Sequence, residues 1–151
     1  DILRGMGAGI TIDHTGVTVH PAQLYGQVID MGRCPDLVPT VAVAACFATG
    51  PTTIKNVAHL RLKESDRIEA VAENCTRAGA AVTTLPDGLR IPPTPLPRGQ
   101  QITFASFDDH RLAMSAALFG LGGLSVRLDN PGCVAKSFPT FWEKWETVRQ
   151  G

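Results

Sequence analysis

Apolar residues recur along this chain at two spacings, the strand spacing in short stretches and the helix spacing in longer ones. The segments 7–13, GAGITID, and 17–20, VTVH, flank a turn closed by Gly16 and predict a β-hairpin. The segment 26–31, GQVIDM, predicts a third strand. The segment 35–50, PDLVPTVAVAACFATG, is apolar on most faces and ends in glycine, which indicates a buried helix.

The central part of the chain continues this pattern. The segment 52–57, TTIKNV, is rich in β-branched residues and predicts a strand. The segment 64–79, ESDRIEAVAENCTRAG, predicts an amphipathic helix closed by a glycine. Its apolar stripe consists of Ile68, Val71, Cys75 and Ala78.

The last part of the chain predicts three strands, a helix, a strand and a final helix, at 80–85, 89–93, 101–107, 109–123, 124–129 and 138–150. The prolines of segment 92–99 cannot donate to a sheet ladder, so this segment is a loop. Strands that alternate with helices imply an α/β fold built as α+β layers, in which helices cover a mixed sheet.

The chain also reads as two copies of one unit. Glycine and alanine at 7–8 return at 79–80, and in the same register Gly16, Val17 and Val19 return as Gly88, Leu89 and Ile91, an offset of 72. The offset then becomes 73, which aligns the pairs Ile29 and Ile102, Asp36 and Asp109, Gly50 and Gly123, Asn56 and Asp129, and Lys63 and Lys136. We therefore expect two similar units within one globular domain, 1–78 and 79–151, the first incomplete at its start.

Charge and composition exclude several classes of function. The 151 residues are 44% hydrophobic and carry 14 basic and 14 acidic side chains, which argues against a nucleic-acid or membrane surface built on bulk charge. The sequence contains neither an apolar run of transmembrane length nor a signal peptide. The four cysteines show no CxxC pair, so buried packing is favoured over metal or disulfide roles, and we expect a reducing compartment. Because the chain begins at Asp1 in what reads as the end of a helix, we expect a fragment of a longer protein.

Charged residues gather where the predicted helices begin. They are Asp36 at the first helix, Lys63, Glu64 and Arg67 at the second, Asp109, His110 and Arg111 at the third, and Lys136 before the fourth. If the two units are alike, these helix starts lie in equivalent places. A helix start offers free N–H groups and the positive end of a dipole, and the basic side chains add charge, so the pattern predicts an anion site. Two arginines can each grip a carboxylate or phosphate with parallel hydrogen bonds.

Each candidate has a structural alternative. Asp36 and Asp109 can act as N-caps and nothing more. Lys63 and Arg67 can lie on an exposed helix face, and His110 can be a helix-start histidine with local partners. Glu64 either stays ionised between its basic neighbours or carries a proton if it is desolvated. The remaining histidines show no metal-ligand spacing.

The motifs LRLKESDRI, DHRLAM and KSFP, in this order with PDLVPTVAVAACFATG before them, resemble the 5-enolpyruvylshikimate-3-phosphate (EPSP) synthase family. The resemblance covers essentially the whole chain and corresponds to the C-terminal part of the family sequence. It implies two globular domains, each made of three βαβαββ units. About two copies of this unit would be present here, and the other domain would be absent.

The resemblance also implies a reaction: the transfer of the enolpyruvyl group of phosphoenolpyruvate to the 5-hydroxyl of shikimate 3-phosphate, with release of phosphate. It gives Asp36 the role of proton acceptor at the hydroxyl and Glu64 that of moving the proton at the methylene carbon. It places Asp36, Lys63 and His59 at shikimate 3-phosphate, although some members carry asparagine at the position of His59. The residues placed at phosphoenolpyruvate are Arg67, Arg111, Lys136 and Glu64, with His110 nearby.

The family further implies a cytoplasmic enzyme that uses no metal or organic cofactor and binds glyphosate as an inhibitor. Because its two domains close around the substrates, we expect this chain alone to be inactive, with the missing N-terminal domain as its partner. Two alternatives remain open. One is the related transferase that acts on UDP-N-acetylglucosamine, and the other is a non-catalytic fragment that binds phosphate ligands. A nucleic-acid-binding role is disfavoured by the zero net charge.

Overall fold

The computed structural model of this protein describes residues 1–63 and 65–150. Its strands are β1 (Gly9–Asp13), β2 (Gly16–His20), β3 (Val28–Asp30), β4 (Thr52–Lys55), β5 (Thr83–Leu85), β6 (Gly88–Ile91), β7 (Gln101–Phe104) and β8 (Ser125–Leu128). Its α-helices are α1 (Ile2–Gly5), α2 (Val38–Cys46), α3 (Arg67–Arg77), α4 (His110–Ala117) and α5 (Phe141–Gln150). Four 3₁₀ turns complete the order, η1 (Pro35–Leu37), η2 (Ala58–Leu62), η3 (Leu118–Gly122) and η4 (Pro131–Lys136).

The strands form three separate sheets. The largest has the order β3-β4-β6-β5, in which β3 and β4 are parallel and β6 is antiparallel to both of its neighbours. Strands β7 and β8 form a parallel pair, and β1 and β2 form an antiparallel hairpin. These strands correspond to the segments that the sequence pattern predicts, and the mixed α/β class is confirmed by the structure.

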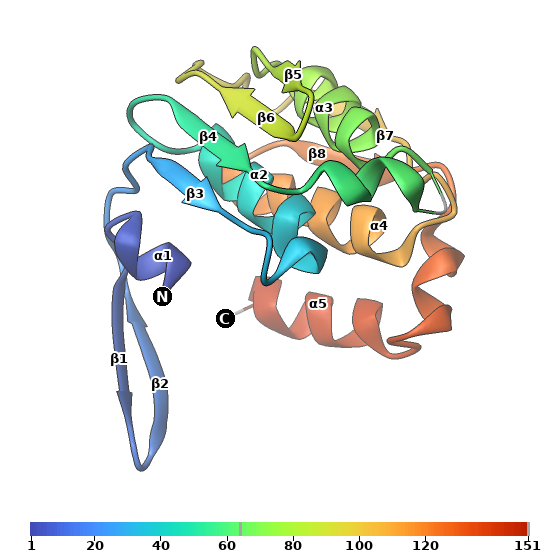
Figure 1. Cartoon of the computed structure of the whole chain (residues 1–151). Helices are drawn as coiled ribbons and strands as arrows, with labels where there is room; N and C mark the ends of the chain where they lie inside the picture. Colours follow the sequence, from blue (N-terminus) through green and yellow to red (C-terminus); the bar gives the residue numbers. More distant parts are fainter. Residues whose placement is uncertain (64, 151) are drawn as a thin grey trace.

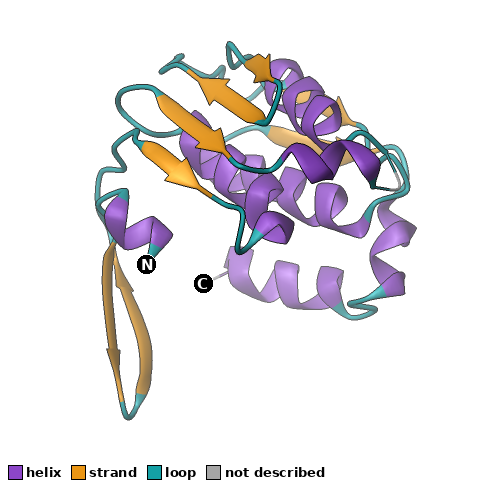
Figure 2. Ribbon diagram, in the orientation of Figure 1, coloured by secondary structure: helices purple, strands orange, loops and turns teal. Residues whose placement is uncertain are grey.

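The helices α2, α3 and α4 pack against one another between the four-stranded sheet and the β7–β8 pair, and α5 lies outside α4 (Figure 2). Helix α2 contacts β4 and β6 on one side and α4 on the other. This explains why α2 carries no charged residue: seven of its nine residues are buried. The sequence prediction of a buried helix at this position is confirmed.

Helix α3 shows the amphipathic pattern in its burial, since Ile68, Val71 and Cys75 are all 3% exposed or less. The helix begins at Arg67, three residues later than the sequence pattern suggests, because the Asp66 carboxylate accepts hydrogen bonds from the N–H groups of Ile68 and Glu69.

The β1–β2 hairpin differs from the rest of the fold because it projects away from the layered body (Figure 1). Its side chains from residue 11 to residue 20 are all exposed. Within the described residues the hydrophobic core instead spans α2, α3, α4 and the inner faces of the other two sheets.

The order hairpin, strand, helix, strand, helix occurs twice along the chain. The second hairpin, β5–β6, pairs with β4, so the largest sheet crosses the proposed boundary between residues 78 and 79. The division into units 1–78 and 79–151 is therefore a proposal about the sequence repeat and does not correspond to separate sheets. In the part of the chain that is described, no helix is long and apolar enough to cross a membrane.

Candidate functional site

Arg67 lies at the centre of the charged groups at the helix starts. Its side chain is only 4% exposed. Nε and Nη2 both lie 2.8 Å from Oδ2 of Asp109, whose side chain is 1% exposed, and Nη1 donates to Oδ1 of Asp36 at 3.2 Å. A buried charge is costly to leave without a partner, so the Asp109 carboxylate is what allows Arg67 to be buried here. The guanidinium joins the starts of α3 and α4 to the turn before α2.

Asp109 also caps α4. Its Oδ1 accepts a hydrogen bond of 2.8 Å from the N–H of Arg111, while its Oδ2 faces Arg67. The N-cap interpretation of Asp109 is thus confirmed, and the same carboxylate serves two purposes. Because both oxygens are engaged and buried, Asp109 is the fixed member of the cluster.

Asp36 does not cap a helix, and that alternative is wrong for this residue. It lies within η1, and the first residues of α2 show no side-chain cap. Its carboxylate instead joins two arginines: Oδ1 faces Arg67 Nη1 at 3.2 Å and Oδ2 faces Arg111 Nη2 at 2.9 Å. With half of its side chain exposed, Asp36 is the accessible member of the cluster.

Lys136 takes part in a neighbouring ion pair. It ends η4, five residues before α5 begins. Its Nζ lies 3.0 Å from Oδ2 and 3.2 Å from the carbonyl oxygen of Asp108, and both side chains are more than half exposed. The partner of Lys136, Asp108, immediately precedes Asp109 in the chain, so the ion pair of Lys136 lies beside the Asp109–Arg67 pair.

Asp108 is a residue that the sequence analysis did not single out. Phe107 and Asp108 both adopt left-handed backbone angles, with φ of 52° and 53°, a conformation that is costly for residues other than glycine. The segment is held by Asp129, whose Oδ1 accepts hydrogen bonds from the N–H groups of Ser106 and Asn130 at 2.8 and 2.6 Å. The sequence offered one indication of a separate role for Asp108. Two adjacent aspartates, Asp108 and Asp109, precede His110, and adjacent carboxylates cannot both cap one helix.

The charged residues before α3 differ in their surroundings: some are held by hydrogen bonds within the chain, and others are exposed to solvent. Arg61 is structural, because it binds Asp66 and Glu69 and donates to the carbonyl of Leu85 at 2.8 Å. The bonds to Glu69 and Asp66 raise the pKa of Arg61. Lys63 and His59 are exposed and form no hydrogen bond or ion pair with another residue in the described ranges.

Two other candidates complete the set. His110 is the first residue of α4, is partly buried, and makes no side-chain hydrogen bond within the described residues. Glu64 lies outside the described residues. The structure thus brings Asp36, Arg67, Asp109 and Arg111 into one cluster, with Lys136 beside it. No group of three or more His, Cys, Asp or Glu in the described part of the chain is arranged to hold a metal ion.

Solved structures place this fold among the enolpyruvyl transferases. The chain superposes on EPSP synthase from Acinetobacter baumannii with a TM-score of 0.79 and 30% identity, over 97% of this chain and 37% of that one. It also superposes on the enolpyruvyl transferase NikO from Streptomyces tendae with a TM-score of 0.73 over 99% of this chain and 34% of that one, which at 23% identity shows the shared fold alone.

Sequence comparison then identifies the family. The EPSP synthase (3-phosphoshikimate 1-carboxyvinyltransferase) family matches residues 1–145, and this chain belongs to it. It is 42% identical to the 3-phosphoshikimate 1-carboxyvinyltransferase of Syntrophobacter fumaroxidans, over 98% of this chain and 35% of the relative. The enzyme of Actinobacillus succinogenes is 38% identical over 99% of this chain and 35% of its own length. The chain spans about a third of the relatives it matches.

Proposed function

We propose that this chain supplies part of the active site of an EPSP synthase and corresponds to the C-terminal part of its longer relatives. The reaction is the transfer of the enolpyruvyl group of phosphoenolpyruvate to the 5-hydroxyl of shikimate 3-phosphate, with release of phosphate. The observation that carries this proposal is the convergence of Arg67 and Arg111, from two helices, on the single accessible carboxylate of Asp36.

This geometry suits an anionic substrate. The two oxygens of Asp36 each face one guanidinium, as the oxygens of a carboxylate or phosphate would. Asp109 is buried and keeps Arg67 in place, whereas Asp36 is half exposed and can turn away. A bound phosphoenolpyruvate would thus take the place of Asp36 between the arginines. Lys136 adds a third cation beside them.

The displaced Asp36 is then available for the second substrate. Its carboxylate would accept the proton of the 5-hydroxyl as that oxygen attacks the enolpyruvyl carbon. Glu64 is proposed to move the proton at the methylene carbon. Lys63 and His59 are both exposed, and both precede α3 in the sequence. These two residues would contact shikimate 3-phosphate, and His110 would lie near phosphoenolpyruvate.

The proposed cluster is open to solvent at Asp36 and at Lys136, which are 50% and 57% exposed. Electrostatic stabilisation of the transition state requires a site from which water is excluded. An N-terminal domain, which the family resemblance implies as the partner of this chain, would close over these groups, so the isolated chain is proposed to be inactive. We expect glyphosate to compete with phosphoenolpyruvate at the completed site, and the assembled enzyme to act in the cytoplasm without a cofactor.

The test is phosphate release from shikimate 3-phosphate and phosphoenolpyruvate. It compares the isolated chain with a chimera in which residues 1–151 replace the matching third of the Syntrophobacter fumaroxidans relative. We expect release by the chimera only. A folded chimera that turns over UDP-N-acetylglucosamine and ignores shikimate 3-phosphate would overturn the substrate assignment, and a folded chimera that is inactive toward both would overturn the proposed function.

Lys136→Ala in the chimera tests the anion site itself. The Lys136–Asp108 pair is mostly exposed, so its loss should cost at most about 1 kcal/mol of folding stability. A lost charge-assisted contact to substrate should lower kcat/KM for phosphoenolpyruvate by about tenfold or more. Arg149→Ala is the matched control, since Arg149 also forms an exposed ion pair, with Glu146. Equal kinetics in the two variants would remove Lys136 from the site.

A further inference from the structure

Lys63 and Lys136 occupy equivalent positions of the sequence repeat, but their surroundings differ. Nζ of Lys136 lies 3.0 Å from Oδ2 of Asp108 and 3.2 Å from the carbonyl oxygen of the same residue. The Lys63 side chain forms neither a hydrogen bond nor an ion pair with another residue in the ranges 1–63 and 65–150. Of the two equivalent lysines, the one in the second unit thus has a carboxylate beside it in this part of the chain, and the other has none.

Position 108 is the source of this difference. The offset of 73 that aligns Lys63 with Lys136 also aligns Pro35 with Asp108. Proline carries no charge, and its ring holds φ at about −65°. Asp108 is charged and has a φ of 53°. The second unit therefore has a carboxylate, and a left-handed backbone that directs it, at a place where the first unit has neither.

The backbone of Asp108 is held in its left-handed conformation by its neighbours. A φ of this kind favours glycine, although aspartate tolerates it better than most residues. The N–H of Asp108 donates to Oγ of Ser106 at 3.3 Å, and Nδ2 of Asn130 donates to Oδ1 of Asp108 at 3.3 Å. Oδ1 thus faces Asn130 while Oδ2 faces Lys136, so the carboxylate has a defined direction. A costly conformation that is held in this way at a cluster of charged groups points to a role for the side chain.

The Asp108 carboxylate offers Lys136 the same kind of contact that a phosphoryl group offers. A negatively charged oxygen 3.0 Å from Nζ forms a charge-assisted hydrogen bond, and phosphate oxygens bind lysine in the same way. A phosphoryl oxygen that approaches Nζ from this side either displaces Oδ2 or lies next to it. Since like charges a few ångströms apart repel, the carboxylate and a phosphoryl group cannot both bind Nζ from this side without a loss of affinity.

We propose that Asp108 sets the affinity of the site for the phosphoryl group of phosphoenolpyruvate by competing with that group for Lys136. This inference rests on the proposed function, in which Lys136 contacts phosphoenolpyruvate. The substrate binds when its phosphoryl group displaces the Asp108 carboxylate from Nζ. The carboxylate returns to Nζ as inorganic phosphate leaves, so it weakens the hold on the phosphate and favours its release.

The two lysines would contact phosphates that have different fates. The phosphate of shikimate 3-phosphate, for which Lys63 is the proposed contact, stays on its substrate throughout the reaction. The phosphate of phosphoenolpyruvate, for which Lys136 is the proposed contact, leaves as a product. A competing carboxylate at Lys63 would weaken substrate binding and nothing else, whereas at Lys136 it also promotes product release. The carboxylate thus lies beside the lysine whose bound anion has to leave.

Steady-state kinetics of the chimera with Asp108→Asn and with Asp108→Gly test this role. Both replacements remove the charge, and both tolerate a left-handed backbone. The asparagine amide can itself donate to phosphate and glycine has no side chain, so an effect that the two variants share reports the loss of the carboxylate. We expect the KM for phosphoenolpyruvate and the inhibition constant of inorganic phosphate to fall by about threefold to tenfold in both variants. The KM for shikimate 3-phosphate should stay unchanged.

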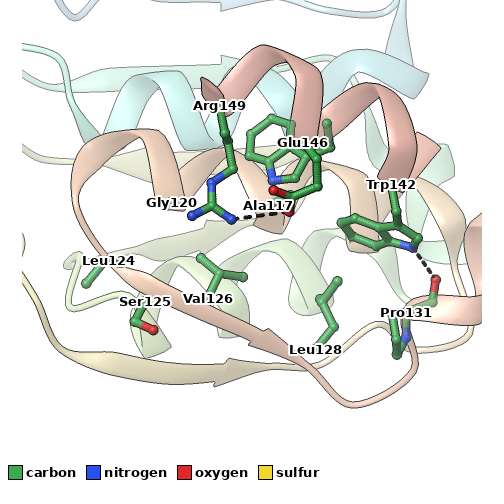
Figure 3. Close-up of a pocket in the computed structure, with 11 residues that line it drawn as sticks. Ala117, Gly120, Leu124, Ser125, Val126, Leu128, Pro131, Trp142, Glu146 and Arg149 are labelled. Carbon is green, nitrogen blue, oxygen red and sulfur yellow. Dashed lines mark hydrogen bonds and ion pairs between the residues drawn. The ribbon is translucent and has the colours of Figure 1, made fainter. Parts of the chain in front are cut away.

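Glu146→Gln is the matched control. It removes a carboxylate from another ion pair whose two side chains are more than half exposed, the pair with Arg149 on α5 (Figure 3). It should leave all three constants as they are in the unsubstituted chimera. If the chimera is active but the Asp108 variants bind phosphate no more tightly than the Glu146 variant, the role of Asp108 is overturned and the proposed function stands. A folded chimera without activity overturns the proposed function, and this inference with it.

Thermal unfolding of the 151-residue chain gives a second readout, which does not depend on turnover. Inorganic phosphate that binds the folded chain raises its Tm by mass action. Phosphate replaces chloride at constant ionic strength, so that general screening of charges stays the same. We expect the rise in Tm to be larger for Asp108→Asn than for the unsubstituted chain or for Glu146→Gln. The same phosphate dependence in all three proteins would contradict competition at Lys136.

Discussion

The two hairpins of this chain occupy the same place in the sequence repeat and have opposite surroundings. Leu89 and Ile91 of β6 are completely buried, whereas Val17 and Val19 of β2 are about two-thirds exposed. The side chains are similar in size and polarity, so the difference comes from the neighbouring strand. Strand β6 has β4 beside it, whereas in the described part of the chain β2 pairs with β1 alone. The comparison teaches that an apolar pattern marks a surface for burial without saying what buries it.

The repeated aspartates Asp36 and Asp109 show the same contrast. Both contact Arg67, but Asp109 is 1% exposed and Asp36 is 50% exposed. One of the two repeat positions thus holds a buried structural carboxylate, and the other holds an accessible carboxylate that we propose takes part in ligand binding. Substitutions at matched positions of the repeat should separate these roles.

The largest difference is expected between Asp109→Ala and Asp36→Ala. Loss of Asp109 removes the buried partner of Arg67 and the cap of α4, and should cost about 3–5 kcal/mol of unfolding free energy. Loss of Asp36 removes only partly exposed contacts, and should cost about 1 kcal/mol or less. Urea unfolding of the isolated chain measures both. Similar costs for the two would show that Asp109 is not the structural member of the pair.

Leu89→Ala and Val17→Ala compare the hairpins directly. Leu89 is fully buried, so truncation should leave a cavity and cost about 2–5 kcal/mol. Val17 is exposed in the single chain, so its truncation should change stability by less than about 0.5 kcal/mol. Urea unfolding of the isolated chain gives both values. A large cost at Val17 would mean that the hairpin packs against the body of the chain.

Gly88→Ala and Gly16→Ala form a third matched pair. A Cβ on Gly88 would overlap the carbonyl oxygen of Ile54, which forces β6 away from β4 and should cost about 1–3 kcal/mol or more. A Cβ on Gly16 meets no atom within 4 Å, and its φ of 147° is the only penalty, about 1 kcal/mol. Thermal unfolding followed by circular dichroism shows which of the two substitutions lowers the stability more. A larger cost at Gly16 would contradict the β4–β6 pairing.

The smallest expected effect is on the pH dependence of folding stability and concerns Asp129, whose equivalent in the repeat is Asn56. Partial burial works to raise the pKa of Asp129, but hydrogen bonds from Ser106 and Asn130 outweigh it and hold that pKa below its ordinary value. In acid the folded state therefore binds fewer protons here than the unfolded state. The stability that Asp129 contributes is complete above the ordinary carboxyl pKa, near 4, and is lost as the pH falls through the lower folded pKa.

Asp129→Asn should consequently flatten the acid side of the stability profile, while costing less than about 1 kcal/mol at neutral pH because the amide oxygen still accepts. Urea unfolding at a series of pH values below 6 measures the slope. Glu143→Gln, at an exposed carboxylate of α5, is the control. An unchanged acid slope in Asp129→Asn would show that this carboxylate does not hold the segment at Phe107 and Asp108 as its hydrogen bonds indicate.

Much of the fold could be predicted because it depends on local pattern. The alternation in 7–20 and 80–91 placed both hairpins, and the uncharged segment 35–50 placed the buried helix. The candidate site was predictable in part, because charged residues at helix starts are visible in the sequence. The joining of Arg67 to Asp109, 42 residues away, was not, since it depends on how α3 and α4 pack. The left-handed conformation of Asp108 was also not predictable, because no glycine marks it.

The sequence alone determined the order of strands and helices, the repeat, and the residues that gather at the helix starts, because periodicity and helix chemistry act over a few residues. Only the tertiary structure decided which of two equivalent carboxylates is buried and which is accessible, and which of two equivalent hairpins is covered. Those outcomes depend on contacts between segments far apart in the chain. The same residue type at the same repeat position takes its role from the neighbour that the fold places beside it.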